Sequence, residues 1–179
     1  MSQPDLINVR GLAELDRALE ELPMKLQRNI LRGAMRAGAR QQLLEARAIV
    51  PVGPPSSRNA KRYGGYAGAL RDSLALGTRI KGTTVSGSVT AGGKGKRAAA
   101  DTYYAHFVER GTRPHVIKAG KTPSLFFGGL VRKMVNHPGA KAQPFMGQAL
   151  ARSAQRALQA VADYIRARLT KAGIETPGP

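Results

Sequence analysis

Two long segments of the chain repeat apolar residues with the period of an α-helix. Between about Met24 and Val50, apolar and small residues form one continuous arc of a helical wheel. A second apolar stripe begins after Pro144, a residue that suits the first turn of a helix, and continues to about residue 170. The pattern therefore predicts two long helices, at about 24–50 and 144–170. A shorter helix is predicted at 11–22, where leucines recur at helical spacing until Pro23 breaks the pattern.

The segment between the long helices has the alternating pattern of strands. After a short helical turn at 67–74, residues 76–89 alternate apolar and polar positions around Lys81-Gly82-Thr83, which predicts a hairpin. In this hairpin, Leu76 or Thr78 is expected to share a face with Ile80, Val85 and Val89.

Two further strands are predicted downstream of the hairpin. The stretch from Tyr103 to His115 mixes aromatic, apolar and polar residues, and we expect an inner strand that ends in a turn presenting Glu109 and Thr112. The apolar run 125–135 suits another strand, although its Gly128-Gly129 pair indicates a bulge or a break. The expected fold class is α+β, with the long helices packed on a small, mainly antiparallel β-sheet.

Composition changes along the chain predict its domain organisation. We expect an N-terminal arm at 1–10, a single α+β domain at 11–171 and a C-terminal tail at 172–179. Within the domain, the Pro-, Gly- and Ser-rich segment 52–66 and the Gly- and Lys-rich segment 92–100 are predicted to be loops that become ordered on assembly.

The charge of the chain is strongly positive and indicates a polyanionic partner. The sequence holds 29 lysines and arginines against 11 acids, a net charge of +18. One third of the helical wheel of 24–50 carries almost only basic residues: Lys25, Arg28, Arg32, Arg36, Arg40 and Arg47. Such a face is either the solvated side of a core helix or a surface that meets a polyanion or a protein partner. The absence of interleaved acids raises the weight of the second interpretation, because solvated helices usually carry pairs of opposite charge.

The cysteine content, the length of the apolar runs and the N-terminus indicate the cellular compartment. The chain has no cysteine, so disulfides and thiolate metal sites are excluded and a reducing compartment is the natural setting. No apolar run approaches the ~20 residues that span a bilayer, and the N-terminus does not resemble a signal peptide. We therefore expect a soluble intracellular product with no membrane partner.

Catalytic motifs are absent from the sequence. His106 and Glu109 have the spacing of a pair of metal ligands, but on a strand they would point to opposite faces. Gly120-Lys121-Thr122 lacks the first glycine of a phosphate-binding loop, and no nucleophile elbow occurs. We predict no catalytic residue, no metal and no cofactor, and we retain a small DNA-processing enzyme only as a weaker alternative.

The order of several short motifs resembles one family of proteins. A helical GL-x-x-L-x-x-x-L pattern at the N-terminus is followed by GALRDSL at 68–74. The segment Tyr-Ala-x-x-Val-Glu-x-Gly-Thr follows, and a Pro-Phe pair then opens the last helix. These motifs are met here by Tyr104, Ala105, Val108, Glu109, Gly111, Thr112, Pro144 and Phe145. The ordered set resembles the tail-completion, or head–tail connector, proteins of long-tailed bacteriophages.

The resemblance implies a non-enzymatic structural protein of the virion neck, made in the host cytoplasm. Such a protein forms a homo-oligomeric ring, expected to be a hexamer, between the portal complex and the tail tube. Its neighbours would be connector or stopper proteins on one side and tail terminator or tail tube proteins on the other. DNA would pass through the lumen without sequence specificity. The alternative is a stand-alone basic DNA-binding module.

The resemblance also suggests which residues form contacts between subunits. The candidates are Tyr104, Glu109, Gly111, Thr112, Pro144 and Phe145. Glu109 could pair with an arginine of the next protomer, or it could be a hydrogen-bonding acid within one subunit, and the sequence leaves both open. The basic face of 24–50 has two candidate partners, DNA in the lumen or an acidic rim of a neighbouring ring. A dense arginine lining would hold sliding DNA tightly, which favours a protein contact for part of that face.

Overall fold

The chain forms two compact units joined in sequence at residues 102–103 and 144–145. A computed structural model describes residues 11–53, 66–92, 102–120, 124–127 and 129–174. The expected arm at 1–10 and most of the expected loops 52–66 and 92–100 lie outside these ranges, as does the tail beyond residue 174. The first unit comprises residues 1–102 and 145–179, and the second comprises residues 103–144.

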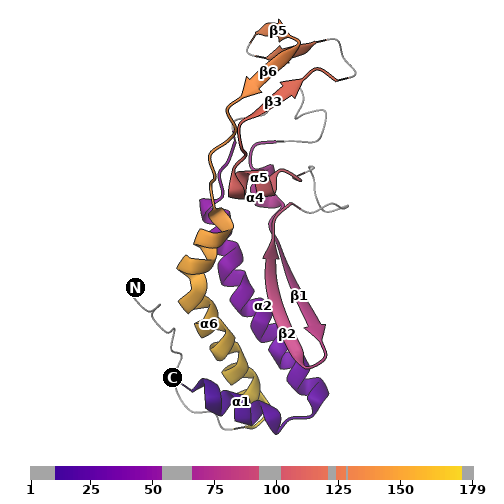
Figure 1. Cartoon of the computed structure of the whole chain (residues 1–179). Helices are drawn as coiled ribbons and strands as arrows, with labels where there is room; N and C mark the ends of the chain where they lie inside the picture. The colour runs from indigo at the N-terminus through magenta and orange to yellow at the C-terminus, as the bar shows by residue number, and fades with distance from the viewer. Residues whose placement is uncertain (1–10, 54–65, 93–101, 121–123, 128, 175–179) are drawn as a thin grey trace, which may run out of the picture. The chain divides into compact units, whose positions relative to one another are not determined.

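The first unit is built on two long antiparallel helices that lie side by side (Figure 1). Its elements are α1 (Leu12–Glu20), α2 (Met24–Ile49), α4 (Ala69–Asp72), β1 (Ala75–Lys81), β2 (Thr84–Thr90) and α6 (Phe145–Lys171). The predicted helices at 24–50 and 144–170 are confirmed as α2 and α6, and the shorter helix at 11–22 is confirmed as α1. The β1–β2 hairpin lies alongside α2.

Small residues allow α2 and α6 to approach each other closely. Ala34 and Ala46 of α2, and Ala149 and Ala162 of α6, are completely buried. A Cβ atom added to Gly38 would lie 2.7 Å from Cγ2 of Val161 and 3.0 Å from the backbone oxygen of Ala157. The two helices are therefore close enough for side chain and backbone to touch at Gly38, and dispersion contacts along this seam are dense.

A half-buried carboxylate joins the same two helices near the C-terminal end of α2. Glu45 is the only acid in α2, and its side chain is 18% exposed. It accepts a hydrogen bond from Nη2 of Arg156 at 2.7 Å and lies 3.9 Å from Nη1 of Arg152. The contact fixes the register of α2 against α6 because both arginines belong to α6.

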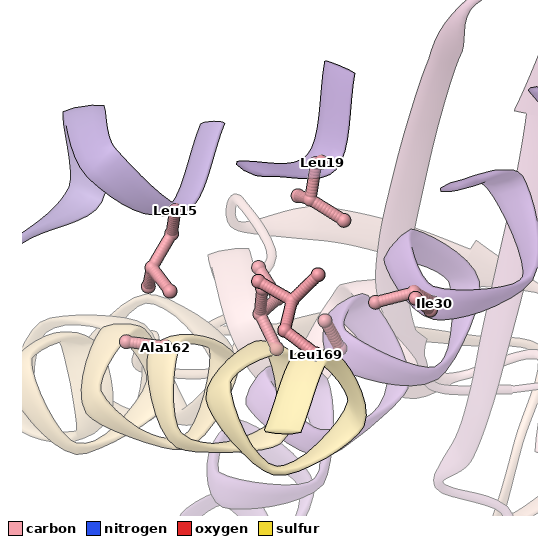
Figure 2. Packing of buried hydrophobic residues seen from close by; sticks show 7 residues of the cluster. Leu15, Leu19, Ile30, Ala162 and Leu169 are labelled. Carbon is pink, nitrogen blue, oxygen red and sulfur yellow. The ribbon is translucent and has the colours of Figure 1, made fainter. Parts of the chain in front are cut away.

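The short helix α1 closes the other end of the helix pair. Its Leu15 and Leu19 are 1% and 3% exposed and join a hydrophobic core with Ile30 of α2 and with Ile165 and Leu169 of α6. Figure 2 shows the leucine side chains of α1 pointing toward α6. The sequence places these leucines at helical spacing, so the burial of one face of α1 follows from its pattern.

The predicted hairpin is present as β1 and β2, and its register places the expected apolar residues on one face. Leu76 pairs with Val89 and Ile80 pairs with Val85, so the four expected apolar residues occupy opposed positions in the two strands. Opposite residues of a ladder project to the same face of the sheet, which confirms the predicted common face. A Cβ atom on Gly87 would lie 2.6 Å from the backbone oxygen of Met35, so a glycine is needed where β2 meets α2.

Both long helices end where the sequence predicts. Val50 leaves the helix in an extended conformation, as expected for a residue that precedes a proline. After α6, Gly173 adopts a φ of 80°, and the N–H of Ile174 donates to the carbonyl of Leu169 at 3.1 Å. This 6→1 bond is the Schellman motif, which satisfies a carbonyl at the end of a helix.

The second unit contains a short helix and two small antiparallel sheets. Its elements are α5 (Ala105–Arg110), β3 (His115–Lys118), β4 (Leu125–Phe127), β5 (Leu130–Arg132) and β6 (Met134–His137). Strand β3 pairs with β6, and β4 pairs with β5. The α+β fold class is confirmed, but the described strands form three two-stranded antiparallel sheets instead of one sheet.

The prediction of an inner strand from Tyr103 to His115 is wrong, because residues 105–110 form helix α5. The residues removed from solvent are Tyr104, Ala105, Val108 and Glu109, which is helical spacing and not alternation. The aromatic residues suggested a strand because they have high β propensity, which tertiary context overrides. The helix stops at Gly111, whose φ of 72° is a left-handed conformation that favours glycine.

The close contact at Gly38 yields a prediction. Gly38→Leu places a large side chain against the backbone of α6, so the helices must separate. We expect the free energy of unfolding to fall by about 1–3 kcal/mol, the usual effect of overpacking. Chemical denaturation followed by circular dichroism measures it. Ala48→Leu is the matched control because Ala48 is exposed on the same helix. Equal stability of the two variants would contradict the close packing.

Candidate assembly surfaces

One face of α2 carries the predicted row of basic residues. Five members of the row are exposed, and Arg28 is half-buried with an Nε that has no hydrogen-bond partner. The exposed members are Lys25, Arg32, Arg36, Arg40 and Arg47. Arg47 donates from Nη2 to the carbonyl of Leu74 at 3.2 Å. Among the described residues, no carboxylate forms a salt bridge with any member of the row. The structure thus brings the predicted cations together on one helix.

The basic row borders a hollow beside α2. This hollow, hereafter the α2 groove, has a volume of about 500 Å³. Its lining consists of Gly33, Arg36, Ala37, Arg40, Leu43, Leu44 and Arg47 of α2, with Leu76 of β1 and Tyr164 of α6. Leu44 in this lining is 52% exposed. This is a high value for a leucine on a helix that packs against both α6 and the β1–β2 hairpin. The groove therefore combines apolar walls with three arginines.

A second, smaller hollow lies on the other side of Tyr164. It has a volume of about 330 Å³ and is lined by Leu26, Asn29, Ile30, Tyr164, Arg168, Lys171 and Ala172. The hydroxyl of Tyr164 accepts a hydrogen bond from Nε of Arg168 at 3.2 Å, and the guanidinium lies 5.2 Å from the ring centroid. A side chain at Gly33 would overlap the ring of Tyr164, so this glycine makes room for the tyrosine that divides the two hollows.

Residues of the Gly-Thr turn that were expected at a subunit interface also have roles inside the second unit. The N–H of Thr112 donates to the carbonyl of Ala140 at 2.9 Å, and the N–H of Ala140 donates back to Thr112 at 3.2 Å. A Cβ atom on Gly111 would lie 2.5 Å from the oxygen of Ala140. The turn is thus held against residues 140–142 of the same unit. Glu109 is half-buried on α5 and is not an unpartnered group.

Tyr104, Pro144 and Phe145 occupy dissimilar environments. Tyr104 is half-buried at the N-terminal cap of α5, and its ring meets that of Tyr103 edge-on at 6.2 Å. Burial raises the pKa of Tyr104 above its ordinary value of 10.0, because the phenolate is poorly solvated there. Pro144 is exposed, and Phe145, the first residue of α6, is 3% exposed. A role for these residues between subunits stays a prediction.

An exposed apolar hairpin in the second unit was not predicted as a surface. Phe126 of β4 and Val131 of β5 are directly opposite in the ladder, and they are 78% and 68% exposed. Leu130 and Met134 are also more than half exposed. The sequence did signal a break at Gly128-Gly129 inside the apolar run 125–135, and that break separates β4 from β5. Periodicity could not show that these side chains face solvent, since an apolar run usually predicts burial.

The described residues contain no group of three or more His, Cys, Asp and Glu side chains that could hold a metal ion. His115 and His137 are paired in register with ring centroids 5.1 Å apart, but no third ligand joins them in the described part of the chain. His106 and Glu109 lie three residues apart on α5 and therefore on one side of a helix, not on opposite faces of a strand. No described helix has the length and apolar character needed to cross a membrane.

Exposed apolar strands and an unpaired cationic helix face are features of proteins that assemble with other macromolecules. Comparison with family models gives the particular family. The model described as "Bacteriophage HK97-gp10, putative tail-component" matches residues 13–111, more than half of the chain. The protein belongs to this HK97-gp10-like family of phage tail components, which confirms the predicted resemblance. Searches of curated proteins and of solved structures found no match.

The matched region covers α1, α2, α4, β1, β2 and α5, and ends at Gly111. It therefore includes the basic row of α2 but neither the apolar β4–β5 hairpin nor α6. A component of the phage tail is part of the virion and contacts other virion proteins.

The raised pKa of Tyr104 predicts a pH effect. The absorbance difference between wild type and Tyr104→Phe, titrated at 295 nm, reports this phenol alone and should show a midpoint above pH 10.0. The folded pKa exceeds the unfolded one, so this contribution to stability is present below about pH 10 and is lost as the pH rises through the folded pKa. A midpoint at or below 10.0 would show that Tyr104 is solvated.

Proposed function

We propose that this protein is a structural ring subunit of the phage neck. In this proposal identical copies form a hexamer that joins the portal or connector complex to the tail tube and surrounds the DNA channel. The protein catalyses no reaction. It completes the tail and is found at the head–tail junction of the virion after synthesis in the host cytoplasm.

The observation that carries the proposal is the family match over residues 13–111. The family match alone does not give a position within the virion. We infer the neck position from the ordered motifs of the sequence, which resemble tail-completion and head–tail connector proteins. The match and the motifs overlap at α1, α4 and α5, so they draw partly on the same residues.

The exposed hairpin of the second unit supports a role in assembly. A phenylalanine that is 78% exposed and a valine that is 68% exposed, placed side by side, cost solubility unless another surface covers them. Such a pair fits contact with the neighbouring connector, stopper, tail terminator or tail tube protein. Lys118, Arg132 and Lys133 are exposed in the same unit, which favours a partner surface with acidic groups around an apolar centre.

The positive charge of the chain affects both the stability of the ring and the attraction of DNA to its lumen. Copies that each carry +18 repel one another, so a ring requires DNA, acidic neighbours or specific contacts between copies to offset the repulsion. DNA passing through the lumen would be attracted without sequence specificity, since phosphate contacts carry no sequence information.

A stand-alone DNA-binding module is the alternative, and the exposed arginines of α2, which form no salt bridge with a described carboxylate, favour it. If that face binds phosphates, the logarithm of the affinity for duplex DNA falls steeply and linearly with the logarithm of the salt concentration. A neck subunit does not need such binding, because DNA must move through the channel.

Phage complementation tests the proposed function. Without the protein, we expect DNA-filled heads and finished tails that fail to join, as seen by electron microscopy. Empty heads would place the defect in DNA packaging and would contradict the neck assignment. Finished, joined particles would show that the protein is not needed for tail completion.

A double variant of the β4–β5 hairpin tests whether its exposed apolar pair takes part in assembly. Phe126→Asp with Val131→Asp should fold normally, because both side chains are exposed, but should fail to enter virions because charge opposes burial in an apolar contact. Ser86→Asp with Ser88→Asp, on exposed positions of β2, is the matched control and should complement fully. Equal incorporation of both variants, measured by mass spectrometry of purified virions, would contradict a role for the hairpin.

A further inference from the structure

Helix α1 presents an outer face that carries four acids around Arg17, and no described base of another element forms a salt bridge with them. Glu14, Asp16 and Glu20 of α1, and Glu21 at its end, are all exposed. The described residues give none of the four a salt bridge. They are four of the 11 acids of the whole chain, and Arg17 is the only base among them. In a protein with a net charge of +18, this concentration of acids makes α1 the most acidic surface of the first unit.

The acidic face of α1 and the α2 groove point away from each other. Helix α1 packs against the core that includes Leu31 on α2. Arg40, in the lining of the groove, follows Leu31 by nine residues, which is about half a turn around the helix. The two charged surfaces therefore lie on different sides of α2 and cannot pair within one protomer.

We propose that the acidic face of α1 from one copy docks in the α2 groove of the next copy. This inference rests on the proposed ring and names the surfaces that hold it together. The occupant is a second copy of this chain, because α1 supplies the acids that the groove's arginines lack, and both surfaces occur once in every protomer.

The dimensions of the two surfaces agree. The nine residues of α1 span about 14 Å, and the stretch from Arg36 to Arg47 spans about 17 Å, at 1.5 Å per helical residue. Helix α1 can therefore lie along most of the length of the groove.

The contact would bury apolar surface as well as charge. Leu44 in the groove is 52% exposed and Leu12 of α1 is 39% exposed, so each partner offers a leucine that the protomer leaves partly uncovered. Isolated ion pairs on a surface contribute little, whereas several charges around an apolar centre favour the correct partner and register. Arg36, Arg40 and Arg47 would form the rim, facing the carboxylates of α1.

The geometry makes the contact head-to-tail. Each copy uses two different surfaces, the acidic face of α1 toward one neighbour and the α2 groove toward the other. The interface is therefore heterologous, and it closes into a ring when the rotation between copies permits it. In this arrangement the basic row of α2 lies between subunits, where acids of the neighbour cover part of it. DNA in the lumen would then not meet a dense line of arginines.

A charge-swap experiment tests the proposal. Variant one is Arg36→Glu with Arg40→Glu, and variant two is Asp16→Arg with Glu20→Arg. In each variant alone, like charges face each other at the interface, and assembly should weaken by at least about tenfold in concentration, since 1.4 kcal/mol per contact suffices for that factor. Native mass spectrometry and sedimentation velocity measure the assembly.

An equimolar mixture of the two variants should restore assembly. The acidic groove of variant one then accepts the basic α1 of variant two, and the basic groove of variant two accepts the acidic α1 of variant one. The restored species should contain the variants in alternation. Arg79→Glu with Lys81→Glu, on exposed positions of β1, changes the charge by the same amount as variant one and should assemble like wild type. Circular dichroism checks that every variant folds.

The outcomes separate this proposal from the proposed ring. If wild type stays monomeric up to its highest soluble concentration, the ring itself is contradicted. If wild type assembles and both variants assemble equally well, the ring stands and the α1–groove contact is overturned. If variant one assembles normally but loses a steeply salt-dependent affinity for duplex DNA, the α2 groove binds DNA and the α1–groove contact is overturned. Two defective variants and a restored mixture support the proposal.

Discussion

The close contact between α2 and α6 determines the architecture of the first unit. At Gly38 the two helices are so near that a Cβ atom would touch the backbone oxygen of Ala157, and alanines fill the seam on both sides. A seam of small residues gives little hydrophobic area per residue, so its stability depends on packing density along the whole length. Glu45 adds a contact to two arginines of α6 that favours one register of the helices, although exposed ion pairs contribute little to stability.

The surfaces available for assembly follow from that pairing. Helix α6 packs on one side of α2, α1 covers the seam near Leu31, and the β1–β2 hairpin rests where Gly87 meets Met35. Between these contacts, the described residues of α2 leave open a strip that holds the basic row and the α2 groove. This strip combines cationic side chains with the exposed Leu44. The second unit contributes a chemically distinct surface, the apolar β4–β5 hairpin.

Periodicity predicted the elements whose burial is governed by one face. The helices α1, α2 and α6 and the apolar face of the β1–β2 hairpin were predicted because their apolar residues recur at a single period. The segment at Tyr103 was mistaken for a strand because α5 has only six residues and aromatic side chains outweigh a weak helical signal. The basic row was found because charge is visible in sequence, whereas the groove beside it needs Leu76 and Tyr164 from distant segments. The exposure of Phe126 could not be predicted, since it depends on what the fold leaves uncovered.

The proposed assembly requires that the helix pair and the β4–β5 hairpin each carry exposed surface that becomes covered in the virion. Oxidative footprinting by hydroxyl radicals, applied to the purified protein and to intact virions, tests this directly. We expect Leu169 and Ile30 to be protected in both samples, and Phe126, Met134 and Leu44 to react in the free protein but to be protected in the virion. Protection of these three exposed residues in the free protein, or equal reactivity in both samples, would contradict the proposed assembly.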